Sequence, residues 1–197
     1  MKKQKIEIPW TKIIVEFVSI VVAVFMALLV DEWKDNHNNK QLARNAMENI
    51  TLEIQKNYDS VLVYHQTYNL RIKEIDSLLY LIRMKSPNVS LKGYQFVILY
   101  GTAWDAAKLT QAFNYMEFEE VGKLSDIYNL QNIYNTTVQN IMNDLLFTED
   151  ADSYDEAEKV LQRHKRVFSG INGFEDQLLD SYRKFLKSKG KLIESGE

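Results

Sequence analysis

The chain has 197 residues, with 24 basic residues against 27 acidic ones and no cysteine. Without cysteine it forms no disulfide and no thiolate metal site. Four of the lysines and two of the glutamates fall in residues 1–30, so residues 31–197 hold 20 basic and 25 acidic residues, a net charge of −5. Nucleic-acid-binding proteins carry a basic footprint, so the composition predicts no nucleic-acid partner.

Sequence motifs for catalysis are missing from the chain. It has no glycine-rich phosphate loop and no serine nucleophile elbow. A di-iron bundle needs Glu-x-x-His pairs, and the residue three before both His65 and His164 is leucine. These two histidines fall on or beside apolar stripes and are predicted to be core or edge residues, whereas His37 is predicted to be solvated. We therefore expect no enzyme activity, no cofactor and no metal.

An apolar run from Ile13 to Val30 is interrupted only by Glu16 and Ser19. As a helix it rises about 28 Å, against a hydrocarbon core of about 30 Å. Trp10 and Trp33 lie at its ends, where indole rings prefer the headgroup level. The run has neither the polar face of a core helix nor the small residues of a signal-peptide cleavage site. We expect residues 13–30 to form a transmembrane helix in a lipid bilayer, with both tryptophans as interface anchors.

The lysines give a slight preference for one orientation. Residues 1–12 carry four lysines, and the 15 residues after Val30 carry three basic residues. Basic residues are enriched on the cytoplasmic side. Residues 1–12 are therefore predicted to be a cytoplasmic tail of a single-pass protein of the bacterial inner membrane, with the bulk of the chain in the periplasm.

The membrane segment EFVSIVVAVFMALLVDEW resembles that of a bacterial, Bacteroidetes-type family of single-pass membrane proteins, whose pattern is roughly E-I-L-L-V-V-I-G-I-L-I-A-L-Q-I-N-N-W. Glu16, Ala27 and Trp33 match the family's Glu, Ala and Trp, while Ala23 replaces its Gly. Leu29 and Asp31-Glu32 also depart from the family pattern, which has Gln and an Asn pair there. Residues 103–131 resemble a later segment of the family with the motifs W-x-x-A and L-S-x-I-Y-x-x-Q. The resemblance implies a membrane anchor with a helical soluble part. The family is defined by a domain of unknown function, so the resemblance implies no particular activity for this chain.

One long helix is predicted from the membrane to about Met84, because no glycine or proline occurs between Pro9 and Pro87. Residues 31–46 are polar on nearly every side and are predicted to form a helical stalk. From Met47 apolar residues recur at steps of three and four, so residues 47–188 are predicted to form a helical bundle. A kink near residues 57–60 is the alternative to a continuous helix, and a globular bundle is favoured over a coiled coil.

Shorter elements follow a turn at residues 85–90. Residues 91–100 are predicted to be a helix, because no second strand could pair with them. Thr102 is a candidate N-cap for a small helix over 103–113, and long helices are expected over 117–147 and 153–188. The predicted fold class is all-α, with an N-terminal transmembrane helix continuing into a long-helix antiparallel bundle, short helices at one end and a frayed C-terminus at 189–197.

The densest mixed patch outside the stripes combines Trp104, Asp105, Lys108 and Tyr115. It is either the mouth of a pocket between short helices or a place where Trp104 plugs the end of the bundle. The plug is the favoured interpretation.

A second candidate site lies on one face of the membrane helix. Ser19, Ala23 and Ala27 are spaced by four, the small-xxx-small pattern that lets helices approach closely. Glu16 falls on nearly the same face. An intramembrane carboxylate points to a functional role, although Lys12, four residues earlier, could pair with it. This face is predicted to meet a second copy of the chain or another membrane protein.

The sequence favours a membrane-anchored helical scaffold or interaction module. One alternative is an extracytoplasmic small-ligand sensor bundle that uses the Trp104 patch and relays through a membrane partner. Another is an accessory subunit of a proton-driven membrane complex that uses Glu16.

Overall fold

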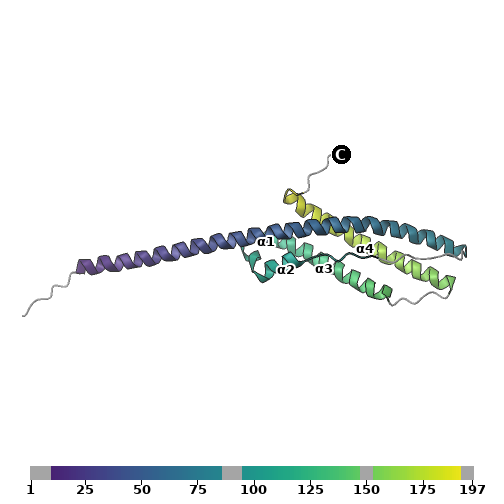
Figure 1. Ribbon diagram of the computed structural model, residues 1–197, viewed down its shortest axis with the longest axis horizontal. Coiled ribbons are helices and arrows are strands. Elements are labelled where there is room, and N and C mark those ends of the chain that lie inside the picture. Colours follow the sequence, from purple (N-terminus) through teal and green to yellow (C-terminus); the bar gives the residue numbers. More distant parts are fainter. Residues whose placement is uncertain (1–9, 86–94, 147–152, 192–197) are drawn as a thin grey trace, which may run out of the picture.

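The computed structural model describes residues 10–85, 95–146 and 153–191, and these residues form helices and no strand. The first helix, α1 (Trp10–Arg83), is a single element of 74 residues, about 110 Å long at the standard rise. Figure 1 shows that its N-terminal part projects as an arm and its C-terminal part joins the bundle. The predicted all-α architecture with a long N-terminal helix is confirmed. The helix passes residues 57–60 without interruption, as the prediction of one continuous helix requires.

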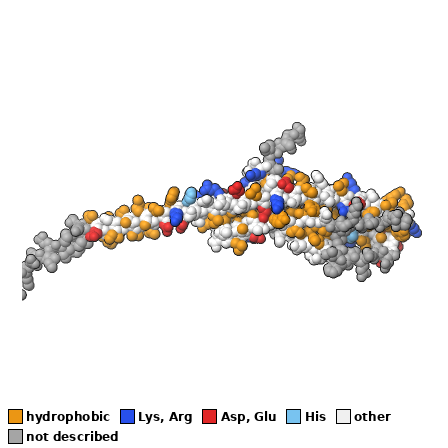
Figure 2. All heavy atoms as spheres, in the orientation of Figure 1, with side chains coloured by type: hydrophobic (Ala, Val, Ile, Leu, Met, Phe, Trp, Pro, Cys, Tyr) orange, Lys and Arg blue, Asp and Glu red, His pale blue; other side chains and the backbone are white. Residues whose placement is uncertain are grey.

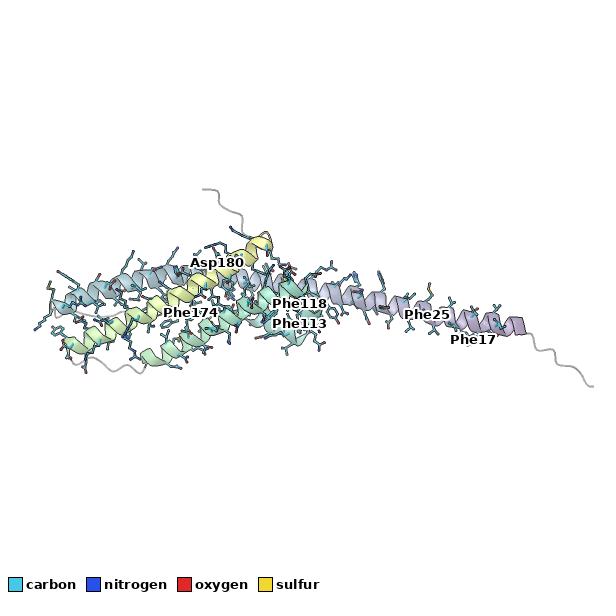
Figure 3. The ribbon with its side chains drawn as sticks, turned by 180° about the vertical axis from the view of Figure 1, so that it is seen from behind. Phe17, Phe25, Phe113, Phe118, Phe174 and Asp180 are labelled. Carbon is cyan, nitrogen blue, oxygen red and sulfur yellow. The ribbon has the colours of Figure 1, made fainter. Side chains whose placement is uncertain are left out.

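The arm is apolar and uncovered. From Ile14 to Val30 its large apolar side chains are 41–66% exposed, and Figure 2 shows orange side chains all along the arm. Phe17 and Phe25 point away from the helix axis in Figure 3. An 18-residue window here has a mean hydropathy of 2.5, with none of it buried. The described chain therefore contains one helix that is long and apolar enough to cross a membrane.

The bundle begins to cover α1 near Ala43, the first buried residue along the helix. Residues 31–38, which precede it, are all exposed. This exposed polar stretch separates the apolar arm from the bundle.

Three helices share a core with a seven-residue repeat. These are the second half of α1, α3 (Phe118–Leu146) and α4 (Tyr154–Ser188). Two turns of an α-helix take about seven residues, so positions spaced by seven stay on one face and line the core of the bundle. The buried repeat comprises Ile54, Val61, Tyr68, Ile75 and Ile82 on α1, Leu124, Gln131 and Val138 on α3, and Leu161, Phe168, Glu175 and Tyr182 on α4.

Polar pairs fix the antiparallel register of α1 against α4. Asn172 donates to Asn69 at 2.9 Å, Lys165 pairs with Asp76 at 2.6 Å, and Arg83 pairs with Glu158 at 2.8 Å. Each step of seven residues along α1 is matched by a step of seven backwards along α4. A shift of one turn would break all three pairs together, so this ladder favours a single register.

The topology requires a long return connection. Figure 1 shows α1 and α3 running in the same direction, with α4 opposite to both. The chain therefore travels back along the bundle between Arg83 and Thr102. Residues 95–100 of this connection have no regular secondary structure, so the helix predicted over 91–100 is wrong for them, while 91–94 and the turn at 86–90 lie outside the described residues.

Two short helices, α2 (Thr102–Leu109) and η1 (Ala112–Tyr115), lie at the arm-proximal end of the bundle. The predicted helix over 103–113 is divided, because Gln111 adopts a left-handed φ of 57°. Thr102 is not the cap. The N-cap position is Gly101, and the carboxylate of Glu53 on α1 accepts from the backbone N–H of Ala103 at 2.9 Å.

The end of α4 is defined by a cap. Gly190 has a φ of +68°, and its N–H donates to the carbonyl of Lys187 at 3.0 Å. The N–H of Lys191 donates to the carbonyl of Leu186 at 3.0 Å. This pair of bonds is the Schellman motif. Residues 189–191 are therefore ordered by a cap instead of frayed as predicted, and 192–197 lie outside the described residues.

Candidate functional site

A buried polar layer connects all three long helices with residues 95–100, which we call the return segment. The side-chain amide of Asn57 on α1 donates to the carbonyl of Tyr100 at 2.7 Å and accepts from its N–H at 3.0 Å. Gln131 on α3 donates to the same carbonyl at 2.6 Å and accepts from the hydroxyl of Tyr182 on α4 at 2.8 Å. Asn57 and Gln131 are 1% and 3% exposed. Because their hydrogen bonds are satisfied, they can lie in the core without a large desolvation cost.

Leu99, the residue before Tyr100, is held in the same way by a side-chain amide. Asn135 on α3 accepts from the N–H of Leu99 and donates to its carbonyl, each at 2.9 Å. Side-chain amides thus take the place of a neighbouring strand for residues 99 and 100. This explains why an apolar segment of the chain can remain extended inside an all-helical core.

A second buried layer surrounds a carboxylate. Glu175 on α4 is 0% exposed, and the hydroxyl of Tyr134 on α3 donates to its Oε1 at 3.1 Å. Its Oε2 lies 3.4 Å from Nδ1 of His65 on α1. On the other side of the imidazole, Nε2 lies 3.6 Å from the exposed carboxylate of Asp176. His65 therefore lies between a buried acid and an exposed one.

The electrostatics of this layer favour a protonated acid. Burial raises the pKa of Glu175 to about 8; the hydrogen bond from Tyr134 lowers it in part, and the charge of Asp176 raises it. Burial and the charge of Glu175 also raise the pKa of Tyr134, so its hydroxyl stays protonated. The layer can hold one proton in the neutral pH range. His65 and His164 are half-buried and buried respectively, as the core or edge prediction required.

A groove of about 510 Å³ lies between α2 and α3. Three of the four residues of the predicted patch, Trp104, Asp105 and Lys108, line it, and Tyr115 does not. The Trp104 ring stacks on Tyr128 of α3 with centroids 5.4 Å apart and planes 5° apart. Trp104 is partly buried and packs against the core. The ring closes the bundle end and also forms one wall of a groove.

Hydrogen bonds hold the side chains at the bottom of the groove in place. The hydroxyl of Tyr128 donates to Oε1 of Glu53 at 2.8 Å, and the other oxygen of Glu53 caps α2. Gln131, from the first polar layer, also lines the groove. The groove is therefore attached to α1 through hydrogen bonds of buried or half-buried groups.

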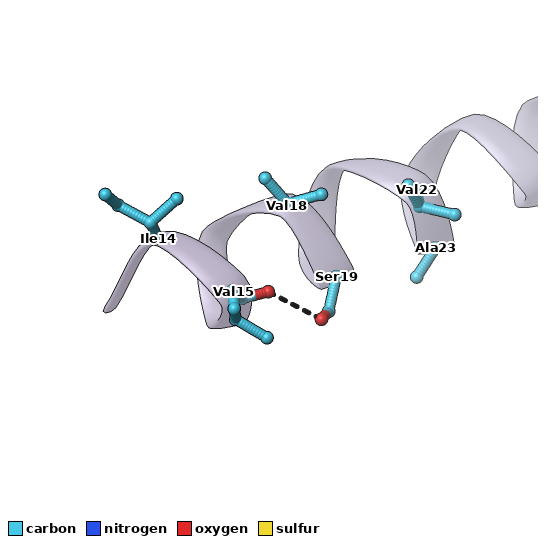
Figure 4. Close-up of a pocket in the computed structure, with 6 residues that line it drawn as sticks. All are labelled: Ile14, Val15, Val18, Ser19, Val22 and Ala23. Carbon is cyan, nitrogen blue, oxygen red and sulfur yellow. Dashed lines mark hydrogen bonds between the residues drawn. The ribbon is translucent and has the colours of Figure 1, made fainter. Parts of the chain in front are cut away.

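On the membrane-helix face, Glu16, Ser19, Ala23 and Ala27 are all exposed. Ser19 and Ala23 line a hollow on this face together with larger valine and isoleucine side chains, and Figure 4 shows these residues on the helix. The Ser19 hydroxyl donates to the carbonyl of Val15 at 2.7 Å. Its donor is therefore used within the helix, and only its acceptor lone pairs remain for a neighbour.

The two predicted interface anchors differ in how far the structure describes them. Trp33 is 73% exposed and stacks on His37, with ring centroids 6.1 Å apart. The side chains of Trp10 and Lys12 lie outside the described residues, and so does the suggested pair of Lys12 with Glu16.

Sequence reasoning missed the residues of both polar layers. Gln131 and Glu175 fall at positions where the seven-residue repeat places an apolar side chain, and Asn57 lies seven residues after buried Ile50 on the core face of α1. That conflict was the available signal, because a polar residue in register with a core stripe needs a buried partner. Their partners, Tyr100 and His65, come from other elements and could not be assigned from spacing.

No protein-family model, no curated protein and no solved structure matches this chain. The fold defines a class only: a three-helix bundle with coiled-coil-like repeats, extended by an exposed apolar arm. The resemblance of the arm to the bacterial membrane family remains a prediction.

Proposed function

We propose that this protein is a single-pass membrane-anchored interaction module, in which α1 links the bilayer and the bundle as one rod. The observation that carries the proposal is the continuity of α1. Its side chains from Ile14 to Val30 are exposed and apolar, and its residues from Ile54 to Ile82 form the centre of the bundle core. Moving the anchor would therefore move the bundle, with no hinge to absorb the motion.

The orientation we propose has residues 1–12 in the cytoplasm and the bundle in the periplasm of a bacterial inner membrane. The lysines of the tail support it. The resemblance of residues 16–33 to a bacterial membrane family agrees with it.

The arm-proximal end of the bundle supplies a contact surface for a partner. Leu109 and Phe118 are 86% and 91% exposed, and Figure 3 shows Phe113 and Phe118 together at this end. Exposed apolar groups that gather in one place mark interaction sites. The stalk of residues 31–42 raises this end about 18 Å, whereas the headgroup layer adds only about 5–7 Å to each side of the hydrocarbon. The height favours the extramembrane part of a neighbouring membrane protein over lipid as the occupant.

Fusion reporters and extraction test the anchor and its orientation. Alkaline phosphatase fused after Glu197 should be active, and a cytoplasmic fluorescent protein at the same place should stay dark. The opposite pattern would reverse the orientation. Release of the full chain from membranes by alkaline carbonate would remove the anchor from the proposal.

Site-specific photo-crosslinking tests the contact surface. A photoreactive phenylalanine at position 118 should give an adduct of one defined mass in intact membranes. The same residue at position 80 is the control, because Tyr80 is also exposed, at 61%, but lies near the far end of α1. Equal adducts at both positions, or an adduct to lipid at position 118, would contradict a protein partner at this end.

A further inference from the structure

The groove between α2 and α3 has the volume of a small-molecule site. Its volume of about 510 Å³ falls within the range of about 300–1,000 Å³ that is usual for small-molecule sites. We propose that it binds a small uncharged polyhydroxylated ligand of the mono- or disaccharide class. This assignment does not depend on the membrane anchor.

One wall presents hydrogen-bonding groups that are not used inside the protein. Ser125, Asn129 and Asn132 lie on α3 at steps of four and three, which places them on one face. All three are exposed, and none forms a side-chain hydrogen bond with the described residues. Each amide both donates and accepts, and so does the hydroxyl. A ligand with many hydroxyl groups matches this mixture of donors and acceptors.

The opposite wall carries no net charge. Lys108 and Asp105 form an ion pair at 2.7 Å across one turn of α2. Phosphates and carboxylates are normally held by unpaired cationic or backbone donors. A neutralised pair offers little attraction to either sign of charge, so an uncharged ligand fits the groove better than a nucleotide or an organic acid.

Trp104 adds an aromatic surface of fixed orientation that is partly covered by its neighbours. Its ring is stacked on Tyr128, and the Lys108 ammonium lies 5.9 Å from the ring centroid. Aromatic side chains of this kind supply apolar contact with little loss of conformational freedom. A sugar ring has an apolar C–H face as well as hydroxyls, so one ligand can satisfy both walls. A purely apolar ligand would leave the three polar side chains of α3 without partners.

The groove is also preorganised. Tyr128 is fixed by Glu53, and Gln131 is fixed by Asn57 and Tyr182. A site whose supporting side chains are already held spends less free energy on ordering when a ligand binds.

Tryptophan fluorescence of the full chain tests this assignment directly. The protein has three tryptophans, so the double substitution Trp10→Phe and Trp33→Phe leaves Trp104 as the sole tryptophan, which is excited selectively at the red edge of the absorption band. The chain is kept in a detergent without a sugar headgroup, because a glycoside detergent would compete. Glucose, N-acetylglucosamine and maltose are titrated separately, with inorganic phosphate and glycylglycine as comparison ligands.

At least one sugar should give a saturable change in Trp104 emission. Asn129→Ala and Asn132→Ala should each weaken that apparent affinity about twofold to tenfold, the effect of losing one or two ordinary hydrogen bonds. Asn140→Ala is the matched control, because Asn140 is an exposed amide of the same helix outside the groove, and it should leave the affinity unchanged. Circular dichroism confirms that all variants keep their helix content.

Three results would overturn the proposal. The first is no saturable response to any of the three sugars. The second is a response that Asn129→Ala, Asn132→Ala and Asn140→Ala affect equally. The third is saturation by phosphate or glycylglycine in place of the sugars, which would assign the groove to a different ligand class.

Discussion

The Oε2 atom of Glu175 lies 3.4 Å from Nδ1 of His65, and neither atom has a hydrogen-bond partner among the described residues. The two side chains come from α4 and α1, and the carboxylate is fully buried. Glu175 occupies a repeat position whose neighbours seven residues away are Phe168 and Tyr182. An acid at such a position must either share a proton or remain an unpaired buried charge, which is costly.

Glu175→Gln is expected to stabilise the protein more as the pH rises. The native state keeps its proton on Glu175 up to about pH 8, whereas an unfolded glutamate loses it near pH 4.5. The native state therefore holds more protons between these values, and stability falls as the pH increases through this window. Glutamine keeps an acceptor for Tyr134 and does not titrate. Thermal unfolding should show little difference near pH 5 and a gain on the order of 1–3 kcal/mol near pH 8.

Asp126→Asn is the control for this pH dependence, because Asp126 is an exposed acid inside α3, more than one turn from either helix end. Its unfolding temperature should follow that of the parent at every pH. If Glu175→Gln follows the parent as well, the buried carboxylate does not hold the extra proton.

Asn57→Leu is expected to destabilise the bundle by about 2–4 kcal/mol. The substitution removes three hydrogen bonds of a buried amide and leaves Tyr100 without a partner for its N–H. Denaturant unfolding measures the free energy, and hydrogen exchange should show faster exchange of the Tyr100 amide. Asn49→Ala, at an exposed position of the same helix, should change stability by less than about 0.5 kcal/mol. A similar cost for both variants would show that Asn57 does not hold the return segment.

Gly190→Ala and Gly173→Ala are expected to change stability in opposite directions. Gly190 has a φ of +68°, which an alanine adopts at a cost of about 1–2 kcal/mol. Gly173 lies inside α4 with open space around its Cβ position, so alanine there should stabilise by about 0.5–1 kcal/mol. The midpoint of denaturant unfolding distinguishes the two. Stabilisation by both would contradict the left-handed cap at the end of α4.

Ala23→Leu is expected to weaken self-association of the membrane helix. The larger side chain fills the hollow at Ser19 and Ala23 and keeps a second helix at a distance. Val22→Leu enlarges a residue that borders the hollow and should have a smaller effect. A membrane two-hybrid assay of the span measures both. Signals equal to the parent for both variants would leave the helix as a plain anchor without an interface.

The sequence by itself determined the three long helices and which of their faces are buried. The absence of glycine and proline between Pro9 and Pro87 set the length of α1, and the three-four spacing set the stripes of α1, α3 and α4. These are local properties, because a helix closes its backbone hydrogen bonds within four residues and its stripe recurs with every turn.

Only the tertiary structure decided the conformation of residues 95–100 and the partners of the buried polar side chains. The apolar pattern of this segment is compatible with a helix, a strand or an extended connection. The extended form is stabilised by hydrogen bonds from Asn57, Gln131 and Asn135, which lie 31 to 43 residues away in the chain. The pairing of Glu175 with His65 has the same origin, since it follows from the register of α4 against α1. Contacts between distant segments depend on how the helices pack together, and no local spacing in the chain encodes that.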